Sequence, residues 1–181
     1  MKQSFFYLIA AILVTCASSA QAQNVPSAAI IDALIPEKTG PVVRSMTSSA
    51  KRGIKISGEL PPEVDLPRIN LTINFELDSA ILTNEGMVAL RSLAKALHDP
   101  RLSGMQFQVA GHTDGRGDNV YNVQLSERRA TTVVEHLVNF YDVDPTRLSA
   151  IGYGMKNPVD PANVMNPLNR RVEIINLAPL S

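Results

Sequence analysis

The chain of 181 residues carries 17 Lys and Arg residues against 17 Asp and Glu residues, so its formal net charge is zero. This balance disfavours nucleic acid as a partner, because a phosphate backbone is bound by a strongly basic face. Its single cysteine, Cys16, cannot form an internal disulfide, so the fold must rely on its hydrophobic core, for which a domain of ~110 residues is long enough.

Residues 1–22 have the pattern of a secretory signal peptide. Lys2 supplies a positive charge, residues 5–14 form an apolar run, and Ala20-Gln21-Ala22 is a small-x-small cleavage site. The run is too short to span a bilayer as a helix, and no later stretch approaches that length. We therefore expect a secreted protein with no transmembrane span.

A second cleavage site competes with the first. Leu13-Val14-Thr15-Cys16 resembles the box that precedes a lipidated cysteine, but Thr15 stands where that box has a small residue. Cleavage after Ala22 is favoured and would make Gln23 the first mature residue. A lipid anchor at Cys16 is the alternative.

Residues 23–68 are predicted to be a leader and linker that is partly flexible. Ser27 to Ile35 is an apolar stretch that fits one or two helical turns, and Pro36 ends it. The prolines and the Ser/Thr-rich stretch that follow leave few residues to build a core. We expect the apolar stretch to dock on the folded domain, with docking on a partner as the alternative.

From residue 69 to about 178 the pattern alternates between strands and helices. Alternating apolar residues predict strands over 69–75 and 105–109. Between them, Thr83 is a suitable N-cap for a helix that Asp99-Pro100 ends.

The second half of this domain repeats the alternation. Residues 119–141 predict a helix that Asp118 caps, with a buried stripe made of Ala130, Val134, Leu137 and Tyr141. Strands are predicted over 147–151 and 170–177, on either side of a loop rich in Pro and Asn. The order indicates an α/β (α+β) fold, a two-layer sandwich with helices on one face of a mixed four-stranded sheet.

Two charged residues carry the main functional signal. Asp114 closes Gly111-His112-Thr113-Asp114 at the end of a strand, and Arg129 lies fifteen positions later on the next helix. A carboxylate accepts hydrogen bonds from an ammonium, and a guanidinium binds a carboxylate through two parallel bonds. The pair suits a ligand with both an amine and a carboxylate, and a plain Asp–Arg salt bridge is the alternative.

The helix adds neighbours to Arg129. Asn122, Ser126 and Arg129 fall at i, i+4 and i+7, on one face that is distinct from the buried stripe. We therefore expect a polar stripe beside the Asp114 loop, with a cleft between them.

Five separated motifs support a family resemblance. They are Asn74-Phe75-Glu76-Leu77-Asp78-Ser79, Gly111 to Asp114 with Gly117, Tyr121-Asn122 with Leu125 to Ala130, Gly152-Tyr153-Gly154, and Asn169 to Ile174. In order and spacing over residues 69–177 they resemble the OmpA-like C-terminal domain. The resemblance implies non-enzymatic binding of peptidoglycan through the diaminopimelate of its stem peptides, in the periplasm of a bacterium with an outer membrane, without cofactor or metal.

The resemblance also implies roles for individual residues. Asp114 would hold the ligand's ammonium, Arg129 its carboxylate, and Asn122 would add hydrogen bonds. Thr113, Asp78 and one of Arg170 or Arg171 would line the same cleft. The chain departs from the family at Glu76, where Asp is frequent, and in the loop from Val159 to Leu168, which lacks a glycine-arginine segment.

Other functions have weaker support. Arg116-Gly117-Asp118 matches an integrin-type tripeptide, but Asp118 has a plainer role as a helix cap. The histidines share no metal-ligand spacing, and His112 is expected to serve in packing or hydrogen bonding. The main alternative is an envelope scaffold that binds an outer-membrane protein partner through the leader or the divergent loop. A function as a wall hydrolase is disfavoured, because the sequence shows no catalytic set. The sequence does not decide whether the protein dimerises.

Overall fold

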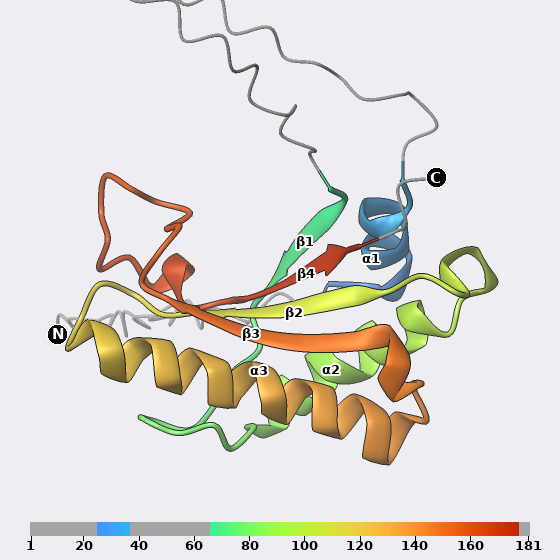
Figure 1. Cartoon of the computed structure of the whole chain (residues 1–181), viewed down its shortest axis with the longest axis horizontal. Helices are drawn as coiled ribbons and strands as arrows, with labels where there is room; N and C mark the ends of the chain where they lie inside the picture. The colour runs from blue at the N-terminus through green and yellow to red at the C-terminus, as the bar shows by residue number, and fades with distance from the viewer. Residues whose placement is uncertain (1–24, 37–65, 178–181) are drawn as a thin grey trace, which may run out of the picture.

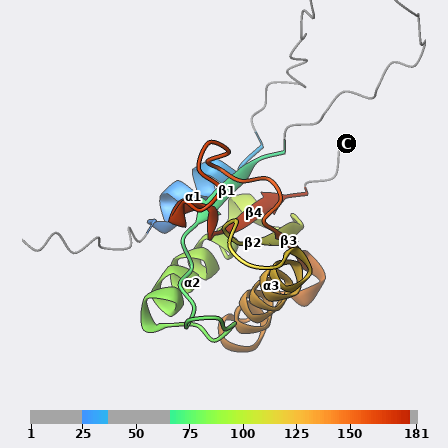
Figure 2. The same ribbon diagram turned by 90° about the vertical axis from the view of Figure 1, so that its left-hand side faces the viewer.

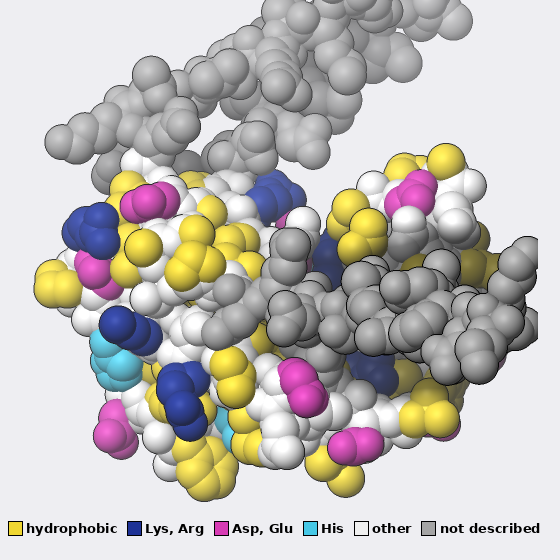
Figure 3. Space-filling model, turned by 180° about the vertical axis from the view of Figure 1, so that it is seen from behind, with side chains coloured by type: hydrophobic (Ala, Val, Ile, Leu, Met, Phe, Trp, Pro, Cys, Tyr) yellow, Lys and Arg dark blue, Asp and Glu magenta, His cyan; other side chains and the backbone are white. Residues whose placement is uncertain are grey.

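The computed structural model describes residues 25–36 and 66–177. The predicted signal peptide, Cys16 and most of the leader lie outside these residues. Within the described ranges, no helix has both the length and the apolar character needed to cross a membrane. On the face shown in Figure 3, acidic and basic side chains are interspersed among hydrophobic ones, in keeping with the neutral net charge.

Four strands form one mixed sheet, as predicted. They are β1 (Arg68–Leu71), β2 (Phe107–His112), β3 (Leu148–Gly154) and β4 (Val172–Asn176), in the order β1-β4-β2-β3. β2 and β3 run parallel, whereas β4 lies between β1 and β2 and is antiparallel to both. The carboxyl ends of β2 and β3 therefore meet at one edge, where the Asp114 loop begins.

Two long helices cover one face of this sheet. α2 (Asn84–Leu97) and α3 (Asn119–Tyr141) form the second layer (Figure 1 and Figure 2). The predicted caps are confirmed, because Thr83 accepts from the Gly86 amide and Asp118 from the Tyr121 amide. Each such cap typically stabilises a helix by about 1 kcal/mol. Short 3₁₀ turns precede or follow the strands at Pro100–Leu102, Pro145–Arg147 and Pro167–Asn169.

The apolar stretch of the leader docks on the domain, as expected. It forms α1 (Ser27–Leu34), which packs against α2 and β1 and buries Ile30, Ile31 and Leu34 in the common core (Figure 2). Its last carbonyl, of Leu34, accepts a 2.7 Å hydrogen bond from the buried Asn176 side chain of β4. The packed unit thus includes residues that precede the predicted domain.

The first strand is shorter than predicted. β1 ends at Leu71, and the predicted residues 72–75 run into a loop closed by the single bridge between Phe75 and Leu82. Asp78 turns the chain here with a φ of 53°, which the alternating pattern could not show. Ile73 is nevertheless buried, so the alternation marks burial and not sheet pairing.

The backbone of α3 packs directly against the glycines of β2 and β3. A Cβ on Gly111 would lie 2.2 Å from the Ser126 carbonyl oxygen, and one on Gly152 would lie 2.4 Å from the Glu127 nitrogen. The Ser126 hydroxyl bridges the two layers, accepting from the Gly154 amide at 2.9 Å and donating to the Val123 carbonyl at 2.8 Å. These contacts set the height of α3 above the sheet.

We predict that Gly111→Ala lowers the free energy of unfolding by about 3 kcal/mol, because the new methyl group must displace helix backbone. Urea denaturation measures the loss. Gln108→Ala, on the same strand, is the control and should cost less than about 1 kcal/mol. Equal stability of Gly111→Ala and the wild type would contradict the close approach.

Candidate functional site

The Asp114 carboxylate is fixed in a frame of donors directly after β2. Its Oδ2 accepts a 2.7 Å bond from Nη1 of Arg170, and its Oδ1 accepts from the Arg116 amide at 3.2 Å. The Arg116 guanidinium adds an ion pair at 3.9 Å. The Asp114 side chain is only 9% exposed. This carboxylate is therefore held in position, with cationic groups on two sides.

Arg129 presents its guanidinium from α3. Its Nε donates to the Ser79 carbonyl at 2.8 Å, and its guanidinium lies 5.1 Å from the centroid of the Phe75 ring. Burial lowers the pKa of Arg129, and the nearby Arg170 cation lowers it further. Both causes make the charged form costly, and a bound anion would offset that cost.

Asp78 joins this group from the loop after β1. Its Oδ1 accepts a 2.6 Å bond from the Tyr121 hydroxyl, and that contact raises the pKa of Tyr121. The carboxylates of Asp78 and Asp114 both act on the charge of Arg129. The structure thus brings together the following predicted residues: Asp78, Asp114, Arg129 and Arg170.

The predicted alternative of an Asp114–Arg129 salt bridge is wrong. Across the described ranges, Asp114 pairs with Arg170 and Arg116, whereas Arg129 bonds the Ser79 carbonyl. Two open hollows flank the segment 78–82 and reach Arg128, Thr132 and His136 on α3. They border the group through Asp78 and do not include Asp114 or Arg129, so the expected cleft between those two residues is not one of these hollows.

Asn122 and Ser126 do not form an open polar stripe, and that prediction is wrong. Both are buried, Ser126 completely, because the glycines of β2 and β3 draw this face of α3 onto the sheet. The Asn122 amide donates to the Arg116 carbonyl at 2.6 Å. Asn122 therefore supports the loop that carries Asp114.

Thr113 has an unusual environment. Its amide donates to the Gly154 carbonyl at 2.8 Å, and the residue is 6% exposed. Its hydroxyl has no hydrogen-bond partner among the residues that the structure describes. A buried polar group left unpaired costs about 1–3 kcal/mol, so a ligand group that reached this hydroxyl would recover part of that cost.

The loop between β3 and β4 packs beside the segment that carries Asp114. Asn169 organises it from inside, donating to the Asn163 and Val164 carbonyls and accepting from the Asp160 amide. The Val164 carbonyl accepts from the Gly115 amide at 2.7 Å. The loop is therefore attached to the Asp114 segment, although its sequence departs from the family.

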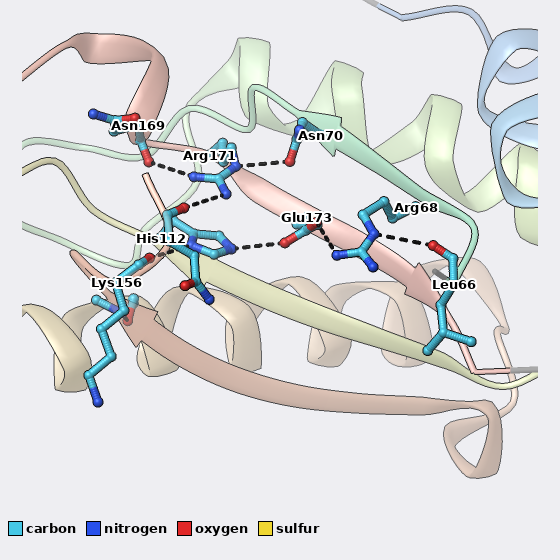
Figure 4. Close-up of polar contacts among 11 residues, drawn as sticks. Leu66, Arg68, Asn70, His112, Lys156, Asn169, Arg171 and Glu173 are labelled. Carbon is cyan, nitrogen blue, oxygen red and sulfur yellow. Dashed lines mark hydrogen bonds and ion pairs between the residues drawn. The ribbon is translucent and has the colours of Figure 1, made fainter. Parts of the chain in front are cut away.

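Arg170 and Arg171 lie in different clusters. Arg170 contacts Asp114. Arg171 donates to the Asn70 side chain at 2.9 Å (Figure 4). It also donates to the Asn157 carbonyl at 3.0 Å. Val172 and Ile174 face the helices, so Arg171 and Glu173 project to the opposite face of β4. Of the two predicted arginines, Arg170 is the one that contacts Asp114.

Glu173 is the centre of this second polar cluster. Its carboxylate lies 3.2 Å from Nε2 of His112 and 3.7 Å from Arg68 (Figure 4). The hydrogen bond from His112 is the largest of the causes that hold the pKa of Glu173 below its ordinary value of 4.5. The expected hydrogen-bonding role of His112 is confirmed. No local pattern in the sequence indicates these partners from β1 and β4.

The integrin-type tripeptide has a structural explanation. Asp118 of the integrin-type tripeptide caps α3, accepting from the Tyr121 amide at 3.0 Å. The described residues contain no group of three or more His, Cys, Asp or Glu side chains placed to hold a metal ion. Arg116, which the sequence analysis treated only as part of that tripeptide, proves to be a neighbour of Asp114.

Known proteins are similar to this chain in sequence and in fold. Residues 74–170 match the OmpA family. The chain is 40% identical over 121 residues to the peptidoglycan-associated lipoprotein of Pseudomonas aeruginosa, covering 66% of this chain and 69% of that protein. It is 36% identical over 115 residues to outer membrane porin F of the same species, covering 62% of this chain and only 32% of the porin.

Solved structures of known proteins also resemble this fold. The cell wall anchor of the T6SS from Pseudomonas aeruginosa superposes with a TM-score of 0.52 at 30% identity, over 65% of this chain and 85% of that one. The periplasmic domain of Helicobacter pylori MotB (residues 90-256) gives 0.54 at 26%, over 65% and 78%. The OmpA-like domain of FopA1 from Francisella tularensis gives 0.51 at 26%, over 60% and 71%.

The second cluster predicts a pH dependence of stability. The pKa of Glu173 is lowered by folding, so its contribution is present above pH 4.5 and is lost as the pH falls through the folded-state pKa. Glu173→Gln should cost about 1.5–3 kcal/mol at pH 7, the usual worth of a charged hydrogen bond, and clearly less at pH 3. Urea unfolding at both pH values measures this. A gap between variant and wild type that is the same at pH 3 would contradict the assignment.

Proposed function

This chain belongs to the OmpA family, and we propose that it binds the peptidoglycan of the cell wall without enzymatic activity, through the diaminopimelate of the stem peptides. The observation that carries the proposal is the separation of Asp114 from Arg129. An anion and a cation lie in one group, each held by other neighbours, and neither neutralises the other. Such an arrangement suits a ligand that carries an ammonium and a carboxylate.

Arg129 is prepared to bind a carboxylate. Its Nε is occupied by the Ser79 carbonyl, while its two terminal nitrogens make no hydrogen bond within the described residues. A carboxylate can accept both terminal N–H groups in parallel, which is the strongest geometry for this pair. Asp114 supplies the opposite end, where the ligand's ammonium would bind. Each charge-assisted bond contributes about 1.5–3 kcal/mol, so a single stem peptide would be held modestly.

The relatives support a place in the cell envelope. One is named a peptidoglycan-associated lipoprotein, another an outer membrane porin, and a solved structure is titled a cell wall anchor. We infer a periplasmic protein associated with the outer membrane and the wall, which anchors or spaces the two. Several linked copies would strengthen retention on a polymer with many stems.

A second candidate is an envelope scaffold that binds a protein partner. α1 buries Ile30, Ile31 and Leu34 in the core, so these side chains are not available to a partner. The loop between β3 and β4 instead exposes the side chains of Val159, Val164, Met165 and Leu168, each about half exposed or more. This candidate therefore depends on the loop, not on α1.

We predict that Asp114→Asn and Arg129→Gln each weaken retention on purified sacculi by roughly tenfold to a hundredfold, since each removes one charged contact of about 1.5–3 kcal/mol. Pull-down at a fixed salt concentration measures the retained fraction, and urea unfolding checks that each variant is folded. Arg128→Gln is the matched control, because Arg128 is the adjacent arginine on α3 and lines the neighbouring hollow instead. Normal retention of both folded variants would contradict the proposal.

The two candidates differ in their response to changes in the loop. Met165→Asp combined with Leu168→Asp places charges on the exposed apolar surface. Wall binding through Asp114 and Arg129 predicts unchanged retention of this variant on sacculi. Loss of retention with an intact fold would favour the loop as the contact surface.

A further inference from the structure

The site contains more cations than anions. Arg116 and Arg170 contact Asp114, and Arg129 lies beside them, so three guanidinium groups share the site with the carboxylates of Asp78 and Asp114. Asp78 already accepts a hydrogen bond from Tyr121. A ligand with one ammonium and one carboxylate would leave this excess of positive charge unchanged.

Arg170 occupies the position that the proposed function gives to the ligand's ammonium. Its Nη1 lies 2.7 Å from Oδ2 of Asp114, and this is its one side-chain hydrogen bond within the described part of the chain. The Arg170 side chain is 46% exposed, in contrast to the 9% of Asp114. A long, half-exposed side chain held by one ion pair can move at small cost. The ligand therefore competes with an internal cation for Asp114.

Displacing Arg170 has an electrostatic consequence. The positive charges of Arg129 and Arg170 already repel each other. Within the described residues, Arg129 forms no ion pair that would offset this repulsion. Once an ammonium takes Asp114, the Arg170 guanidinium would be left beside Arg129 without a partner. A second carboxylate on the ligand would accept hydrogen bonds from the displaced Arg170 guanidinium. The ion pair lost with Asp114 would then be replaced by one with the ligand.

We propose, resting on the function proposed above, that Arg170 exchanges its ion pair with Asp114 for one with a second carboxylate of the ligand. The site would thereby select stem peptides that carry two free carboxylates close to the ammonium. Arg129 binds the carboxylate on the same carbon as the ammonium, and Arg170 binds the other. Amidation of that other carboxylate weakens binding, and the whole of this loss depends on Arg170.

A stem peptide offers two sources of the second carboxylate. One is the α-carboxylate of the γ-linked glutamate that precedes diaminopimelate, and the other is the peptide's terminal carboxylate on diaminopimelate itself. Both would present the same chemistry to Arg170. Amidating them one at a time separates the two sources.

The test uses the N-acetylated tripeptide of alanine, γ-linked glutamate and diaminopimelate, together with its two mono-amides. Calorimetric titration measures the Kd of each peptide for the wild type and for Arg170→Gln. The wild type should bind the free acid about tenfold more tightly than one of the mono-amides, because one charged contact is lost. Arg170→Gln should bind the free acid and that mono-amide within about twofold of each other. Arg128→Gln, the control, should discriminate as the wild type does.

The outcomes separate the two proposals. If the wild type binds the tripeptide and both mono-amides equally, or if Arg170→Gln keeps the full discrimination, the exchange is overturned while the proposed function stands. If the wild type binds no form of the tripeptide, the proposed function fails and the exchange fails with it. Unfolding in urea confirms that Arg170→Gln is folded before its affinities are compared.

Discussion

The close packing of the α3 backbone against β2 and β3 determines the geometry of the site. Gly111 and Gly152 leave no room for a side chain beneath the helix, and the Ser126 hydroxyl joins the helix to Gly154. With the helix at this height, the Asn122 amide reaches the Arg116 carbonyl and supports the Asp114 loop. The same helix carries Arg129 to the Ser79 carbonyl. One packing constraint thus sets the positions of both charged ends of the proposed ligand site.

The site combines a buried anion that accepts several contacts with a more exposed cation. Asp114 is buried and receives hydrogen bonds from two directions, whereas Arg170 is half exposed and held through one ion pair. Behind it, Glu173 and Arg171 connect β4 to β1 and to the loop after β3, on the face away from the helices. This second cluster joins the neighbouring elements without using the charges near Asp114. A binding protein needs such a fixed frame, because ordering the site on binding would reduce its affinity.

Local signals in the sequence predicted most of the fold. The helix caps at Thr83 and Asp118 and the mixed sheet are confirmed, because capping and periodicity act within a few residues. Long-range contacts were not predictable in the same way. Asn176 bonds Leu34 across 142 positions, and the choice between Arg170 and Arg171 depends on which face of β4 each side chain takes. The burial of Ser126 between helix and sheet was not predicted, because helical spacing alone does not show how closely a sheet approaches a helix.

We propose that Asp114 and Arg129 bind the two charged ends of one ligand. Nuclear magnetic resonance titration of the labelled protein with the acetylated stem tripeptide tests this most directly. Binding at both residues should produce the largest shifts at the backbone amides of residues 113–116 and at the Nε–H of Arg129. Shifts confined to the exposed loop over 159–168, or the absence of any shift at Arg129, would contradict it.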